Sequence, residues 1–183
     1  MKYQIIYADP PYKYIQGKSM GTNFAGAADR HYTCMPLEDI KCLPVATIAE
    51  GKCILFLWVT FPMLREGLEV IKAWGFEYKT VAFTWVKTNV NNMGFLFGVG
   101  YYTKSNAEVC LLATRGNAHQ LVRDNSISQM IMTPKMLHSH KPPEVRERIV
   151  QMLGDLPRIE LFARRKVEGW DSWGLEVESD IEL

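Results

Sequence analysis

Short apolar runs recur along the chain and predict buried strands. Residues 3–8 are rich in Ile and Tyr, and residues 53–59 are apolar at every position, as in a strand whose two faces are both covered. Val81, Phe83 and Trp85 alternate with less apolar positions and indicate another strand. The full set of predicted strands spans residues 3–8, 53–59, 76–86, 108–114, 129–133 and 158–163.

Two segments between these runs have helical spacing instead. The first helix is expected to begin near Pro62 and end at Gly75, and the second to begin at Pro142-Pro143 and end at Gly154. Their apolar positions are Leu64, Leu68, Ile71 and Trp74 in the first and Val145, Ile149, Met152 and Leu153 in the second. Strands that alternate with helices, without an internal repeat, predict one doubly wound α/β domain over residues 1–183 with a mostly parallel sheet.

Glycine-rich and polar segments separate these elements. The sequence predicts loops at about residues 12–33, 87–105 and 134–141. The first two are long for a compact domain, and such loops commonly serve as lids over a functional site.

Composition narrows the class of protein. The chain is 48% hydrophobic and 22% charged, and its apolar runs are shorter than the roughly 20 residues of a membrane span. We therefore expect a soluble, cytoplasmic protein without a signal peptide. The four cysteines form no C-x-x-C pair, which argues against zinc and favours free thiols. A formal net charge of +1 argues against a protein that coats DNA, but is compatible with an enzyme that grips a few nucleotides.

The chemistry-bearing motif is Asp9-Pro10-Pro11-Tyr12. Asp9 is the first residue after the first predicted strand, and ligands of open α/β sheets bind beyond the carboxyl ends of the strands. Pro10 and Pro11 fix their own backbone and restrict the residue before each of them. The motif therefore holds a carboxylate, the Pro10 carbonyl and an aromatic ring in a rigid arrangement.

These three groups favour methylation of an adenine amino group. The Asp9 carboxylate and the Pro10 carbonyl can accept its two N–H hydrogens, direct its lone pair at an electrophilic methyl and favour the positive charge that develops on nitrogen. Tyr12 can stack on the base after it has left the helix. A plain turn is the alternative interpretation, since Asp and Pro are ordinary turn residues. The preceding buried strand and the following glycine-rich segment favour the functional one.

Five segments, residues 8–12, 55–59, 85–89, 139–144 and 159–164, match the motifs of a known family in the same order over nearly the whole chain. Through them the chain resembles the MT-A family of S-adenosylmethionine-dependent adenine methyltransferases. This resemblance implies a single-domain, Rossmann-like class I methyltransferase fold, and the implied chemistry needs no metal. The family usually has Trp where this chain has Tyr12, and either ring can stack on a base.

The resemblance also implies roles for individual residues. Besides Asp9, it places Lys141 on the carboxylate of the cofactor's methionine, and Glu160 and Arg164 near the ribose hydroxyls. Phe162 is a further candidate for the cofactor site, although packing in the core explains this residue equally well. A surface lysine and a solvated ion pair are the alternatives for Lys141 and for Glu160 with Arg164. The candidate substrate-binding residues are Tyr32, Lys87, Thr88, Asn89 and His140, whereas the tryptophans at positions 58, 74 and 85 are expected in the core.

Two departures from the family affect the cofactor pocket. Leu175 stands near the position where the family often has a ribose-binding Asn, a contact that Glu176 can replace but Leu175 cannot. Only eight residues precede Asp9, so we expect a pocket that is more open or is completed by another segment, such as residues 123–128.

The substrate has more than one candidate. An enzyme that methylates adenine in DNA, in a bacterial or phage-infected cell, is the leading hypothesis, and an RNA adenine methyltransferase of the same fold is the second. A cytosine amine is disfavoured because that chemistry usually pairs Ser with Pro-Pro-Tyr. A catalytically inactive nucleic-acid-binding subunit is disfavoured by the intact Asp9 and Lys141. Whether the protein is a homo-oligomer stays open.

Overall fold

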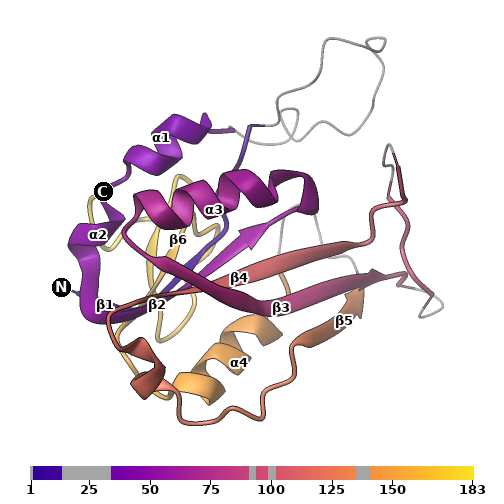
Figure 1. Cartoon of the computed structure of the whole chain (residues 1–183). Coiled ribbons are helices and arrows are strands. Elements are labelled where there is room, and N and C mark those ends of the chain that lie inside the picture. Colours follow the sequence, from indigo (N-terminus) through magenta and orange to yellow (C-terminus); the bar gives the residue numbers. More distant parts are fainter. Residues whose placement is uncertain (1, 14–33, 91–93, 99–101, 135–140) are drawn as a thin grey trace.

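The computed structural model describes residues 2–13, 34–90, 94–98, 102–134 and 141–183. Its centre is a seven-stranded sheet in the order β5-β3-β4-β2-β1-β6-β7 (Figure 1). In this sheet β4 is antiparallel to both of its neighbours, whereas the other four pairings are parallel. The strands are β1 (Tyr3–Ala8), β2 (Ala49–Val59), β3 (Glu77–Thr88), β4 (Ala107–Arg115), β5 (Met130–Pro134), β6 (Arg158–Leu161) and β7 (Asp171–Trp173).

Helices cover both faces of this sheet. Helix α3 (Leu64–Ala73) lies on one face and α4 (Glu144–Leu153) on the other (Figure 1). Two short helices, α1 (Leu37–Cys42) and α2 (Val45–Ile48), pack on the same side as α3. Single turns of 3-10 helix, η2 (Phe61–Met63) and η3 (Ala118–Leu121), follow β2 and β4. The central strand β1 and the second half of β2 are buried on both sides as a result, which explains their continuous apolar runs.

The buried apolar side chains form two cores, one on each face of the sheet. Ile71 and Trp74 of the α3 region pack on one face, and Val145, Ile149 and Leu153 of α4 pack on the other. Both long helices end where the sequence predicts, because Gly75 and Gly154 adopt positive φ angles of 79° and 83°. The tryptophans at positions 58, 74 and 85 are at most 3% exposed and are core residues, as expected.

Several details differ from the expectations. Lys87 and Thr88 end β3 rather than begin a loop, since their backbones still pair with β5. Three further elements, α1, α2 and β7, were not predicted from the sequence. These are short, and a segment of three to six residues has too few apolar positions to reveal a period.

Candidate active site

The carboxyl ends of the central strands meet at one edge of the sheet. Ala8, the last residue of β1, is paired with Leu57 of β2 and Leu161 of β6. Asp9 therefore leaves β1 between the ends of two neighbouring strands. Because β4 is antiparallel to β2, the start of β4 rather than its end lies at this edge. Glu108 directly precedes Val109, which pairs with Val59 at the end of β2.

Backbone hydrogen bonds fix the chain after Asp9. The Tyr12 N–H donates to the Pro10 carbonyl at 2.9 Å, and the Met35 N–H donates to the Pro11 carbonyl at 2.8 Å. Tyr12 forms a bridge with Met35, and its side chain is 7% exposed within the core on the α3 side. The proline pair thus forms the rigid turn that the sequence predicts, with the Tyr12 ring packed under it.

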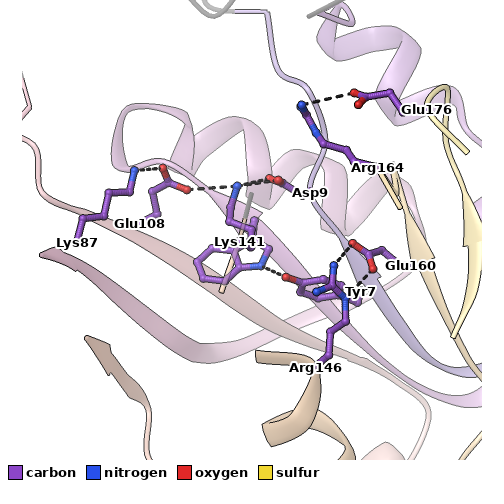
Figure 2. Close-up of polar contacts among 10 residues, drawn as sticks. Tyr7, Asp9, Lys87, Glu108, Lys141, Arg146, Glu160, Arg164 and Glu176 are labelled. Atoms are coloured by element: carbon purple, nitrogen blue, oxygen red, sulfur yellow. Dashed lines mark hydrogen bonds and ion pairs between the residues drawn. The ribbon is translucent and has the colours of Figure 1, made fainter. Parts of the chain in front are cut away.

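A chain of alternating charges runs along this edge (Figure 2). Lys141 Nζ lies 2.7 Å from both carboxylate oxygens of Asp9 and 3.3 Å from Oε2 of Glu108. The other oxygen of Glu108, Oε1, accepts a hydrogen bond from Lys87. The order is Lys87, Glu108, Lys141, Asp9, and the two cations balance the two carboxylates.

Burial makes these contacts strong. The side chains of Lys141 and Glu108 are 10% and 15% exposed, and the ammonium of Lys141 also lies 5.5 Å from the centre of the Trp58 ring. Burial alone lowers the pKa of Lys141, but Asp9 and Glu108 outweigh it and raise that pKa well above its usual value. Burial likewise opposes ionisation of Glu108, yet Lys141 and Lys87 hold the pKa of its carboxyl below its ordinary value. Lys141 and Glu108 are therefore both charged at neutral pH.

A second ion pair lies beside the first group, on the α4 side. Arg146 binds Glu160 through two parallel bonds, with Nε 2.7 Å from Oε2 and Nη2 2.6 Å from Oε1 (Figure 2). The guanidinium stands 5.3 Å from the centre of the Tyr7 ring, and the Tyr7 hydroxyl accepts a 2.8 Å hydrogen bond from Trp58 Nε1. Burial raises the pKa of Tyr7 well above its usual value, so its hydroxyl stays neutral.

A pocket of about 380 Å³, including space open to solvent, joins the two groups. Its lining residues are Tyr7, Asp9, Lys141, Arg146, Glu160, Phe162, Arg164 and Arg165.

The wall formed by the end of β6 has an unusual backbone. Phe162 has a φ of +61°, a left-handed conformation that is rare for a bulky residue and that clusters at functional sites. Its ring packs edge-on against Trp173 at 5.3 Å between centres. Gly174 lies close to the backbone of Ala163. A Cβ at position 174 would be 2.4 Å from the Ala163 carbonyl oxygen, so no larger residue fits without a backbone shift.

Comparison with known proteins identifies the family. The model of the MT-A70 family matches residues 3–176, which is nearly the whole chain. The chain belongs to the MT-A70 family. It is 35% identical to the type II methyltransferase M.MunI of Mycoplasma sp, over all of this chain and 81% of that protein.

Two longer members of the MT-A70 family are also similar. The N(6)-adenosine-methyltransferase MT-A70-like protein of Drosophila melanogaster is 28% identical over 89% of this chain, and human N(6)-adenine-specific methyltransferase METTL4 is 30% identical over 96%. The chain spans 24% and 37% of the lengths of these two relatives.

The predicted cofactor residues of this MT-A70 protein come together. Asp9, Lys141, Glu160, Phe162 and Arg164 all line the same pocket. Their individual roles stay predictions. Of the two alternatives for the pocket, completion by residues 123–128 is not seen, because these residues do not line it; the backbone N–H groups of Arg123 and Asp124 bond instead to the Met152 carbonyl at the end of α4.

The predicted substrate residues have mixed outcomes. Lys87 enters the charge chain, and the Thr88 hydroxyl is buried without a hydrogen-bond partner among the described residues. The Asn89 amide donates to the Phe95 carbonyl at 3.3 Å. Tyr32 and His140 lie outside the described residues, as do most of the predicted loops at 12–33 and 134–141.

Near the pocket mouth, the residues that depart from the family are also placed. Arg164 Nη1 lies 3.5 Å from Glu176 Oε1, and Leu175 is 86% exposed. Leu175 therefore has little packing contact, while Glu176 is paired with Arg164, a residue of the pocket lining.

Sequence reasoning missed Glu108 and Arg146. Glu108 stood at the start of a predicted strand and Arg146 within a helix, where a charged residue carries no signal of its own. A clue for Glu108 lies in the connection before it. The 18 residues between Asn89 and Glu108 contain no predicted helix, and such a connection indicates a hairpin rather than a crossover between parallel strands.

Within the described residues, no group of three His, Cys, Asp or Glu side chains is placed to hold a metal ion. All four cysteines are free thiols. No helix of the described part is long and apolar enough to span a membrane.

Proposed function

We propose that this protein transfers a methyl group from S-adenosylmethionine to the exocyclic N6 amine of adenine in DNA, on a single-domain class I methyltransferase fold. The observation that carries the proposal is the meeting of Asp9 and Lys141, 132 positions apart in the chain, at the carboxyl edge of the sheet beside a pocket. Membership of the MT-A70 family supports it.

The residues of the pocket fit this cofactor. Lys141 is placed to hold the carboxylate of its methionine, because an ammonium with three donors suits a carboxylate. Glu160, fixed by Arg146, and Glu176, held by Arg164, offer acceptors for the ribose hydroxyls. When bound, the cofactor supplies an electrophilic methyl group on a sulfonium.

Asp9 and Pro10 act on the adenine. The Asp9 side chain is 22% exposed and reaches the pocket, so a base can approach it. The Pro10 carbonyl already accepts the Tyr12 N–H, and its second lone pair is left for one hydrogen of the amine. Together they bind both N–H groups, turn the nitrogen lone pair away from the ring system and stabilise the positive charge that develops on it.

The comparison with the type II methyltransferase supports DNA as the substrate. Type II methyltransferases modify DNA, and M.MunI matches this chain from end to end. An RNA substrate is the second candidate. It is supported by the similarity to the adenosine methyltransferase of Drosophila, of which this chain spans about a quarter.

We place the nucleic-acid contact on the arm, which we define as residues 89–106 between β3 and β4. Four of its described apolar side chains are exposed, Val90 by 76%, Phe95 by 49%, Phe97 by 58% and Tyr102 by 101%, whereas Leu96 is half-buried. The segment contains no Asp or Glu, and Lys104 Nζ lies 5.6 Å from the centre of the Phe97 ring. Exposed aromatic rings beside a cation are the surface on which bases stack and phosphates bind.

Backbone hydrogen bonds order the base of the arm. The Leu96 N–H donates to the Lys87 carbonyl at 2.9 Å, and the Gly98 N–H donates to the Ser105 carbonyl at 2.6 Å. A Cβ at Gly98 would lie 2.8 Å from that Ser105 oxygen, so glycine permits the close approach. These bonds hold Phe97 at the same edge of the sheet as Asp9.

The decisive experiment compares Asp9→Ala with the wild type. We expect Asp9→Ala to retain the fold and to lose turnover by about a hundredfold or more, the scale for removal of an electrostatic stabiliser. Turnover is measured as transfer of a labelled methyl group to mixed DNA and RNA. Sequencing of the methylated adenines then shows which of the two nucleic acids is the substrate. Asp155→Ala is the matched control, because Asp155 lies before β6 at the opposite edge of the sheet and its side chain is 91% exposed. Wild-type turnover in Asp9→Ala contradicts the proposal.

The arm has its own test. We expect Phe97→Ala to weaken binding of a labelled oligonucleotide by about tenfold, the scale of one base–aromatic stack, and Phe97→Trp to restore it. Fluorescence anisotropy measures both. Tyr78→Ala is the control, since Tyr78 is also an exposed aromatic of this hairpin, at 42%, but lies at the other end of β3.

A further inference from the structure

We infer that Lys141 and Glu108 couple the two ligands of the site: Lys141 withholds Asp9 from adenine until it can turn part of its charge to the carboxylate of the cofactor. Glu108 is the positioning residue that keeps Lys141 in place during the exchange. This inference rests on the proposed function and adds an order of binding to it, with cofactor before base.

The first step is a count of donors. An ammonium has three N–H groups, and those of Lys141 face three oxygens: Oδ1 and Oδ2 of Asp9 at 2.7 Å each and Oε2 of Glu108 at 3.3 Å. The side chain is 10% exposed, so water does not supply a ready replacement for any of them. Lys141 therefore binds another carboxylate only by releasing one of these oxygens.

The second step concerns Asp9. Both of its oxygens lie against the same cation, and a charge-assisted hydrogen bond is roughly twice as strong as a neutral one. An adenine amine can still reach the remaining lone pairs of these oxygens, but the ammonium polarises both oxygens towards itself and makes them weaker acceptors for a neutral donor. In this arrangement Asp9 is placed correctly but is already engaged.

The third step assigns the part of Glu108. Its two oxygens have different partners, Lys87 on Oε1 and Lys141 on Oε2. The longer contact to Lys141 leaves the ammonium nearer to Asp9, while Lys87 fixes the carboxylate from the other side. Glu108 therefore retains Lys141 at the pocket when one of the Asp9 oxygens is released, and prevents the whole ammonium from following the cofactor.

Lys141 is distinguished from the arginines by its contacts. Arg146, another cation of the pocket, binds both oxygens of Glu160 through Nε and Nη2, so its carboxylate partner is Glu160 rather than Asp9. The coupling is specific to the carboxylate end of the cofactor, because Lys141 rather than Arg146 contacts Asp9.

The test uses two ligands that differ at that end. S-adenosylhomocysteine carries the amino-acid carboxylate, whereas 5′-methylthioadenosine has the same nucleoside and thioether without it. A labelled oligonucleotide that the enzyme methylates is compared with one that has purine, which lacks the N6 amine, in place of the target adenine. Anisotropy gives the preference for adenine over purine with no ligand, with saturating S-adenosylhomocysteine and with saturating 5′-methylthioadenosine; calorimetry establishes saturation.

We expect a preference for adenine of about tenfold with S-adenosylhomocysteine, the scale of one hydrogen bond to a charged group, and none with the other two conditions. In Glu108→Gln the preference should fall toward twofold, because Lys141 is less well held. Glu77→Gln, an exposed glutamate of β3, is the matched control and should leave the preference unchanged.

Two results overturn the inference. An equal preference for adenine with 5′-methylthioadenosine, or without a ligand, shows that Lys141 does not withhold Asp9. An unchanged preference in Glu108→Gln removes the role of Glu108. Failure of the proposed function is distinct: S-adenosylhomocysteine would not bind in the calorimeter, and no oligonucleotide would be methylated.

Discussion

The two groups of ion pairs at the pocket differ in how their cations are held. Lys141 shares three donors between two carboxylates and stands just before α4, whereas Arg146 is within α4 and binds one carboxylate through a rigid fork. A lysine ammonium is a compact charge on a flexible stem, while a guanidinium fork matches a single carboxylate. This difference fits the inferred exchange of partners at Lys141, whereas the Arg146 pair joins α4 to β6 as scaffold.

The strongest test of this contrast is removal of the fork. Arg146→Ala leaves Glu160, whose side chain is 10% exposed, without its partner, so we expect a loss of about 3 kcal/mol in the free energy of unfolding. Arg146→Lys should lose less because it keeps the charge. Urea unfolding measures both, and Arg65→Ala, at an arginine that is 87% exposed, should change the value by less than about 0.5 kcal/mol. A mild effect of Arg146→Ala would show that the pair is not scaffold.

Removal of the exchangeable cation should change binding more than folding. We expect Lys141→Met to weaken binding of S-adenosylhomocysteine by about thirtyfold, because one hydrogen bond between charged groups is lost. Binding of 5′-methylthioadenosine, which lacks the carboxylate, should stay the same. Calorimetry with the two ligands measures this, and an equal loss for both would mean that Lys141 acts on pocket shape rather than on the carboxylate.

The smallest effect is expected from Glu108→Gln and depends on pH. The folded state lowers the pKa of Glu108 below its ordinary value of 4.5, so the ionised carboxylate stabilises the fold above that value. This contribution is lost as the pH falls through the lower pKa of the folded state. We expect Glu108→Gln to destabilise by about 1 kcal/mol at pH 7 and the difference from wild type to shrink toward pH 3. Urea unfolding at several pH values checks the trend, and a difference that is constant with pH contradicts it.

Local patterns predicted much of the fold. Continuous apolar runs gave the long strands, and glycines at 75 and 154 gave the ends of both long helices, because each signal lies within a few residues. Strand direction is different in kind. The reversal of β4 depends on the connection through the arm and on pairing with β2 and β3, neither of which is written in the residues of β4 itself.

The same limit applies to the site. Asp9 was predictable because its position follows from a strand and two prolines next to it. Lys141 was predictable through resemblance to a family. Glu108 and Arg146 were missed because their partners are distant in the sequence or belong to another element: Glu108 reaches Lys141, and Arg146 reaches Glu160. Such pairs arise from the closing of the sheet and helices on one another.

The reversed strand also ties the arm to the chemistry. Because β3 ends and β4 begins at the same edge of the sheet, Lys87 and Glu108 flank the two ends of the arm. Their ion pair joins these ends. Glu108 has one oxygen on Lys87 and the other on Lys141, so a single carboxylate connects the base of the arm to the lysine that contacts Asp9.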